Sequence, residues 1–163
     1  MKRYVPILRG VIMVISCMLC IVSTCEAENP ALKRECEAKA RQAAELIQTL
    51  GPESAFQKIT DPHGPFVSRT SHVFCIDGGS GSLLAHKVAR FVGSNMHYYT
   101  DADGNHPYSG MLQSAKQSAS GWSHYMTYGS EPERRKAPGL KHMHFFKVPG
   151  KNIVLCCGYW DDA

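Results

Sequence analysis

The sequence predicts a single α+β domain in which a long helix covers a mostly antiparallel sheet. Three observations support this: an amphipathic helical pattern early in the chain, five short segments rich in β-branched and aromatic residues, and short turns between the last three of them. With 163 residues, 44% hydrophobic and 20% charged, the chain is long enough for one packed core. The same numbers disfavour extended disorder and a multidomain enzyme.

Three segments have helical periodicity. From Ala31 to Leu50, apolar residues recur every three or four positions and form one stripe, with charged residues on the remaining surface. Gly51 and Pro52 end this helix, because glycine caps helices and proline cannot continue one. Pro52 suits the first turn of a second, shorter helix that extends to about Ile59. A third helix is expected over Pro107–Ala119.

Five segments predict strands. His72–Asp77 is apolar on both faces, which indicates a central strand covered on both sides. Ser82–His86 follows a glycine-rich turn and should pair with it as a hairpin. The remaining three are joined by short turns, so the sheet should be mostly antiparallel. They are Gly121–Tyr128, Leu140–Val148 and Ile153–Trp160. This order is typical of PAS-like domains, with the long helix on one face and the segment before the third strand on the other.

Residues 1–27 have the order of a secretory signal peptide. Three basic residues precede an uncharged, mostly apolar run at residues 10–23, and small or neutral residues lead to Ala27. We expect cleavage after Ala27, and a mature domain of residues 28–163 that is periplasmic or secreted and not inserted in the membrane. One alternative is a retained anchor, for which the run is short against roughly 20 apolar residues. The other is a lipoprotein attached through Cys25.

Removal of the leader also changes the charge. It takes away three basic residues and one acidic residue, so the formal net charge falls from +4 to about +2. The sequence has no long run of lysine or arginine, so we expect no nucleic-acid partner.

Four cysteines remain in the mature chain. In an exporting compartment they are candidates for one or two disulfides, and metal ligation is the alternative. Neighbouring residues of a strand point to opposite faces, so the adjacent Cys156 and Cys157 should not pair with each other. The four candidates are Cys36, Cys75, Cys156 and Cys157.

Several short motifs follow one another in a recognisable order. They are Gly51–Phe56 (GPESAF), Asp61–Phe66 (DPHGPF), Gly81–His86 (GSLLAH), Phe91–Asn95 (FVGSN), Asp101–Gly104 (DADG), Gly121–Trp122 with Tyr125, Val148–Gly150 (VPG) and Gly158–Tyr159. Together they resemble a single Cache domain of type 2, from about Ala31 to Trp160. The strand Lys141–Lys147 departs from the family pattern, since histidines stand where lysine and serine are expected.

The resemblance implies an extracytoplasmic module that senses a small molecule and performs no catalysis. Cache domains of this type often bind short carboxylates beneath the helical insertion, and they usually belong to membrane signalling proteins. A small molecule and a membrane signalling protein are therefore the expected partners. Because the chain ends at Ala163, shortly after the last predicted strand, we expect a free-standing domain. The PAS-like strand order places Cys75 beside Cys156 or Cys157, or one of these opposite Cys36, and predicts at least one disulfide.

Five residues are predicted to contact the ligand. His142 and His144 lie two apart on one strand, so both imidazoles face the same way and could hold an anionic group. They could instead bind a metal together with His124. The third alternative is that they bind nothing and are either packed in the core or exposed to solvent. Trp122 and Tyr125 would form aromatic walls, although their odd separation puts them on opposite faces unless a bulge intervenes. His86 leads into the insertion, where the resemblance places the pocket; the set is His86, Trp122, Tyr125, His142 and His144.

Two hypotheses from other classes stay open. Eight histidines and seven cysteines would suit a metal- or haem-binding redox protein, although no Cys-x-x-Cys motif occurs after residue 27. A protein-interaction module with the same fold is the other. Hydrolase, phosphate-loop and zinc-protease motifs are missing from the sequence, so we expect no enzymatic activity and no cofactor. Asp101–Gly104 begins like a calcium loop but lacks the later acidic ligand, so a turn is predicted there.

Overall fold

The computed structural model describes residues 28–129 and 135–161. The predicted signal peptide, its cleavage site and Cys25 lie outside these residues. Within the described part of the chain, no helix has both the length and the hydropathy needed to cross a bilayer.

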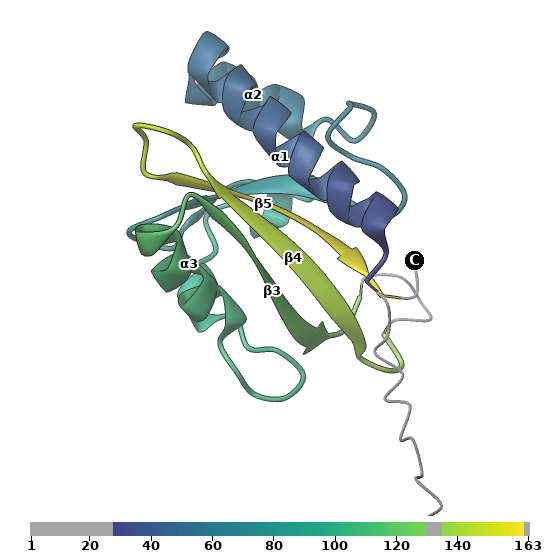
Figure 1. The fold of residues 1–163 in the computed structure, drawn as a ribbon. Helices are drawn as coiled ribbons and strands as arrows, with labels where there is room; N and C mark the ends of the chain where they lie inside the picture. Colours follow the sequence, from purple (N-terminus) through teal and green to yellow (C-terminus); the bar gives the residue numbers. More distant parts are fainter. Residues whose placement is uncertain (1–27, 130–134, 162–163) are drawn as a thin grey trace, which may run out of the picture.

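Helix α1 (Pro30–Leu50) and helix α2 (Pro52–Thr60) agree with the prediction to within a residue or so at each end. Asn29 caps α1, because its side chain accepts hydrogen bonds from the backbone N–H groups of Ala31 and Leu32 at 3.1 and 3.2 Å. Gly51 ends α1 with a φ of 79°, a conformation that glycine adopts without a steric penalty, and α2 starts immediately after it. The two helices pack on each other above the sheet (Figure 1).

The five strands form one sheet in the order β2-β1-β5-β4-β3, and every neighbouring pair is antiparallel. The first and last strands are therefore neighbours at the centre, as the sequence predicts. The inner residues of β1 are buried, as expected for a strand covered on both faces. The strands are β1 (His72–Asp77), β2 (Leu83–Ala85), β3 (Ser120–Thr127), β4 (Gly139–Lys147) and β5 (Ile153–Trp160).

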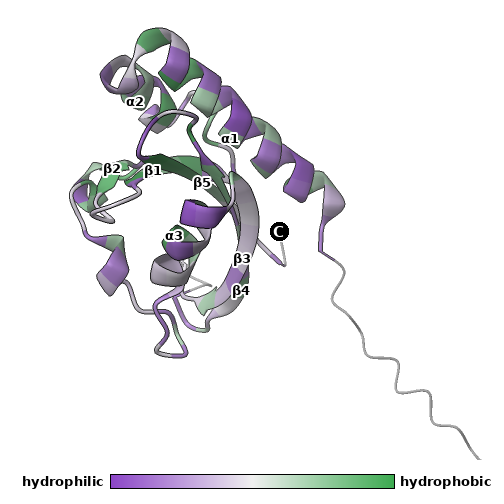
Figure 2. Ribbon diagram, turned by 60° about the vertical axis from the view of Figure 1, so that its left-hand side comes forward, coloured by the Kyte–Doolittle hydropathy of each residue, from purple (hydrophilic) through white to green (hydrophobic). Residues whose placement is uncertain are grey.

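Helices cover both faces of the sheet. Helix α1 lies across one face, and helix α3 (Pro107–Gln117) lies against the other. Figure 2 shows the sheet curling around α3, with α1 on its outer side. Two short 3₁₀ helices, η1 (Ala89–Phe91) and η2 (Met96–Tyr98), precede α3 in the segment between β2 and β3. This segment is called the insertion below. The α+β architecture with a long N-terminal helix on a five-stranded sheet is confirmed.

Alternate residues of the strands fill two separate cores. The α1 face of the sheet contributes Val73, Leu155 and Tyr159 to a core shared with α1 and α2. The α3 face contributes Phe74 and Met143 to a core shared with α3. Because successive side chains of a strand alternate between faces, the core that a residue joins identifies the face to which it points.

The motif at Asp101–Gly104 forms a turn, as predicted. The Asp101 side chain accepts hydrogen bonds from the backbone N–H groups of Asp103 at 3.0 Å and Asn105 at 2.8 Å. This carboxylate is thus occupied by its own loop, in the manner of an Asx turn.

Candidate functional site

The sheet separates the five predicted ligand contacts into two groups. Trp122, His142 and His144 lie on the α1 face, whereas Tyr125 lies on the α3 face. His86 follows β2, and its ring lies 5.7 Å from that of Phe74, which belongs to the α3 face. The β3–β4 register is regular from Ser120 to Thr127, so no bulge brings the two groups together. One small molecule therefore cannot contact all five residues.

A cluster of tyrosines lies under the insertion on the α3 face. The hydroxyl groups of Tyr108, from α3, and Tyr125, from β3, form a buried hydrogen bond of 2.7 Å. The ring of Tyr99 packs 5.1 Å from that of Tyr108, and its hydroxyl bonds to the Thr127 hydroxyl. Burial raises the pKa of Tyr108 and of Tyr125 well above the usual value, so both phenols are neutral and keep their protons for hydrogen bonding.

A histidine pair lies at the other end of this face. The Nε2 atoms of His72 and His86 are 3.2 Å apart, and the two rings are nearly perpendicular. His86 Nδ1 accepts the backbone N–H of Val88 at 3.0 Å, so in the neutral ring the proton must sit on Nε2 and be donated to His72. This arrangement fixes the tautomer of both rings.

Both imidazoles of this pair are uncharged at neutral pH. Burial, together with the positive charges of Lys141 and Lys87, lowers the pKa of His86 to about 4, although its hydrogen bond with the Val88 backbone acts in the opposite direction. Burial together with the same two lysines holds the pKa of His72 well below its usual range. The environment therefore disfavours a further positive charge, and a negative charge placed here would relieve that effect.

The ring of Phe74 connects the two polar ends of the α3 face. It lies 5.8 Å from His72 and 6.2 Å from Tyr108, measured between ring centroids. The face thus carries an aromatic wall between a histidine pair and a tyrosine cluster. Binding sites for small molecules commonly combine such an apolar wall with a few polar groups that fix orientation.

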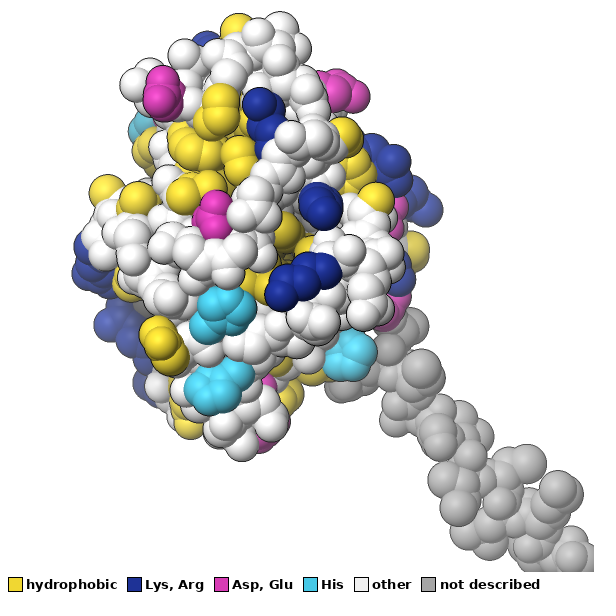
Figure 3. Space-filling view, turned by 90° about the vertical axis from the view of Figure 1, so that its left-hand side faces the viewer, with side chains coloured by type: hydrophobic (Ala, Val, Ile, Leu, Met, Phe, Trp, Pro, Cys, Tyr) yellow, Lys and Arg dark blue, Asp and Glu magenta, His cyan; other side chains and the backbone are white. Residues whose placement is uncertain are grey.

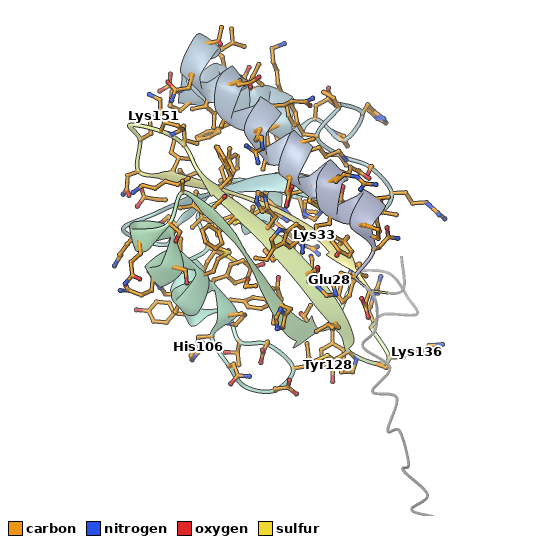
Figure 4. The ribbon with its side chains drawn as sticks, viewed as in Figure 1. Glu28, Lys33, His106, Tyr128, Lys136 and Lys151 are labelled. Carbon is orange, nitrogen blue, oxygen red and sulfur yellow. The ribbon has the colours of Figure 1, made fainter. Side chains whose placement is uncertain are left out.

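On the α1 face, Trp122 and His144 belong to contacts that hold α1 on the sheet. Trp122 Nε1 donates a hydrogen bond of 3.1 Å to Glu37, and Lys33 Nζ lies 5.2 Å from the centre of the indole ring. The His144 ring packs 5.0 Å from Trp122, and burial lowers its pKa to about 4. Figure 4 shows Lys33 beside Glu28 at the N-terminal end of α1, above the sheet, and these two residues form an ion pair.

His142 is also part of a packed arrangement. Its ring stacks on that of Tyr159 at 5.0 Å, and its Nε2 lies 2.9 Å from an oxygen of Asp161. His124 is directly opposite on β3, with 6.3 Å between ring centroids. The predicted same-face placement of His142 and His144 is confirmed. Among residues 28–129 and 135–161, however, no three histidine, cysteine or acidic side chains are placed to hold a metal ion.

A surface groove of about 350 Å³ lies between α1 and the β4–β5 turn, and none of the five predicted residues lines it. Figure 3 shows hydrophobic side chains near the helical layer, flanked by lysine and arginine, with histidine side chains lower on the same surface. The groove lining is Arg41, Ala44, Glu45, Gln48, Thr49, Phe146 and Pro149.

The sequence interpretation named Tyr125 and His86 on the α3 face, but it did not name His72, Tyr99 or Tyr108, which the structure places beside them. His72 begins a predicted strand, and nothing in the sequence shows that its ring meets that of His86 across the hairpin. Tyr108 follows the apolar periodicity of α3 and so resembles an ordinary core residue. The adjacent tyrosines Tyr98 and Tyr99, just before the Asp101 turn, are the sequence feature that could have indicated polar aromatic side chains in the insertion.

No family model matches the chain, and no curated protein matches it either. Solved structures do resemble it. A methyl-accepting chemotaxis protein from Vibrio parahaemolyticus RIMD 2210633 superposes with a TM-score of 0.65 at 17% identity, covering 82% of this chain and 90% of that one. A periplasmic sensor domain of a chemotaxis protein gives a TM-score of 0.58 at 10% identity, covering 80% and 90%.

A third structure, described as showing carboxylic acid recognition by a Cache chemosensory domain, gives a TM-score of 0.57 at 14% identity, covering 80% of this chain and 88% of that one. Each of the three matches covers at least 80% of this chain and at least 88% of the other chain. At these identities the likeness is one of fold. The chain therefore has the fold of a single Cache-like sensor domain.

Proposed function

We propose that this domain binds a small molecule on the α3 face of its sheet, beneath the insertion, and acts as a sensing module without catalysis. One observation carries the proposal: a buried aromatic wall on this face ends in hydrogen-bonding groups on both sides. Tyr108 and Tyr125 form one end, His72 and His86 form the other, and Phe74 lies between them. The similarity to a methyl-accepting chemotaxis protein and to a periplasmic sensor domain supports the same role.

A short carboxylate is the ligand class that these groups favour. The neutral phenols are donors, and the Nε2–H of His86 would exchange its bond to His72 for one to the ligand. A carboxylate accepts such bonds with both oxygens. The positive charges of Lys141 and Lys87 act on the histidine pair and would attract an anion. The structural neighbour described as recognising a carboxylic acid supports this choice.

The location and the signalling partner follow from the same role. A sensor for external small molecules must meet them outside the cytoplasm, which agrees with the signal peptide predicted at residues 1–27. A bound ligand has to be reported onward, and a membrane signalling protein is the partner we propose. Trp122, His142 and His144 lie on the opposite face, so we assign them no direct contact with this ligand.

A binding experiment on the α3 face tests the proposal. Purified protein is titrated calorimetrically with short mono- and dicarboxylates, first as wild type and then as Tyr125→Phe. Loss of a hydrogen bond to a charged ligand costs about 1.5–3 kcal/mol, so the dissociation constant should rise roughly 10- to 150-fold. Tyr128→Phe removes the same hydroxyl from an exposed position and is the matched control.

Two results separate success from failure. If Tyr125→Phe weakens binding and Tyr128→Phe does not, the site lies on the α3 face. If Tyr125→Phe binds every carboxylate like the wild type, whereas His144→Phe on the α1 face loses binding, the assignment is wrong.

A further inference from the structure

Two of the four cysteines meet across the interface between α1 and the sheet. Cys36 lies on the buried side of α1, and Cys157 lies on the α1 face of β5; both are 0% exposed. The neighbouring Cys157 side chain raises the pKa of the Cys36 thiol, which places the two side chains close to each other. Both thiols belong to the same hydrophobic core, at the point where α1 packs on β5.

The other two cysteines have different surroundings. Cys75 points to the α1 face, opposite Leu155, whereas Cys156 points to the α3 face. The Cys156 thiol lies 3.8 Å from the sulfur of Met111, which belongs to α3. The sheet therefore lies between Cys75 and Cys156. Cys75 pairs with Leu155 on β5, which is two residues before Cys157 along that strand. Among the possible pairings, Cys36 with Cys157 is favoured, because both side chains lie in the core where α1 packs on β5 and each faces the other element.

We infer that Cys36 and Cys157 form a disulfide when the chain folds in an oxidising environment, and that this bond clamps α1 onto β5. Cys36, Cys75, Cys156 and Cys157 are not joined by disulfides in the structure. The clamp would join the long helix to the central strand and leave the α3 face outside the cross-link. This inference does not depend on the proposed ligand site.

The reaction needs a disulfide oxidant, and glutathione disulfide is the probe chosen here. The thiolate of one cysteine attacks glutathione disulfide, forms a mixed disulfide and releases one glutathione thiolate. The second cysteine thiolate then attacks the protein sulfur of this mixed disulfide and releases the second glutathione thiolate. Two protons and two electrons leave the protein, and one glutathione disulfide becomes two glutathione molecules.

The timing of the bond follows from burial. The neighbouring Cys157 and burial raise the pKa of Cys36, so the native thiol is protonated and shielded from solvent. The bond should therefore form during folding, while both sulfurs are still accessible, and only slowly in protein that has already folded in the reduced state.

Peptide mapping without reduction tests the inference on the wild-type chain of residues 28–163. The protein is denatured, reduced, and refolded with glutathione and glutathione disulfide. We expect a cross-linked peptide pair containing Cys36 and Cys157, with Cys75 and Cys156 recovered as free thiols. Reduction of this product should lower its melting temperature by on the order of 10 °C, because the bond closes a loop spanning most of the domain.

Matched variants complete the test. Cys75→Ala should still give the cross-linked pair, whereas Cys36→Ala should give none. Recovery of four free thiols from natively refolded wild type would overturn the inference, and so would a dominant link between Cys75 and Cys156. Neither result requires any variant to fold.

Discussion

The packing of His144 makes the stability of this domain sensitive to acid. Its side chain is 2% exposed, it packs against Trp122, and its Nδ1 atom has no hydrogen-bond partner among the described residues. Burial lowers its pKa from an ordinary 6.5 to about 4. The unfolded chain therefore takes up a proton on this ring at a higher pH than the folded domain does.

The sign and size of the effect follow from this difference. Well above pH 6.5 the His144 ring is neutral in the folded and in the unfolded chain, so its protonation does not reduce the free energy of unfolding. As the pH falls from 6.5 toward 4, only the unfolded state gains the proton, and the free energy of unfolding drops. At about 1.4 kcal/mol per pKa unit, the loss assigned to His144 between pH 7 and pH 4 is about 3 kcal/mol.

Urea unfolding followed by far-ultraviolet circular dichroism at pH 7 and pH 4 measures this contribution. His144→Phe keeps an aromatic ring beside Trp122 but cannot be protonated, so its pH-dependent loss should be about 3 kcal/mol smaller than that of the wild type. His63→Phe makes the same change at an exposed position and should leave the wild-type pH dependence intact. If His144→Phe and the wild type lose equal stability on acidification, the assignment of this loss to His144 is refuted.

Two further predictions concern the packing of the α3 face. Gly158→Ala should reduce the free energy of unfolding by about 1–3 kcal/mol. The added Cβ would lie 2.7 Å from the backbone oxygen of His142 and 2.9 Å from the Met143 methyl. A urea unfolding curve equal to that of the wild type would contradict this prediction. Tyr108→Phe and Tyr125→Phe should each cost about 1–3 kcal/mol, and the double variant should cost less than their sum, since neither hydroxyl is then left unpaired. If the losses of stability in the two single variants add up to the loss in the double variant, the two hydroxyls are not coupled.

Most of the fold was predictable, because periodicity, glycine and proline mark the elements directly. The strand Ile153–Trp160 has the predicted bounds, and α1 begins one residue earlier than expected. The separation of three residues along β3 also predicted that Trp122 and Tyr125 point to opposite faces of the sheet. These features depend on local sequence, which is why they could be obtained without the structure.

The site was harder to predict for a physical reason. Strand β4 is covered on both sides, so apolar and aromatic residues occupy both of its faces, and alternation alone does not show which face meets α1. His142 and His144 were consequently grouped with Tyr125, whereas Met143 and Phe145 are the buried residues of β4 that share its face. The meeting of His72 and His86 depends on a hairpin whose register shifts between Cys75 and Ile76. An irregularity of this kind has no clear sequence signal.

The central claim is that the α3 face holds the ligand, and a crystal structure of the domain with a bound carboxylate tests it most directly. The account predicts a carboxylate beneath the insertion, with at least one oxygen within hydrogen-bond distance of the Tyr125 hydroxyl or of His86 Nε2. A ligand found on the α1 face beside Trp122 and His144, with the α3 face unchanged, would contradict it.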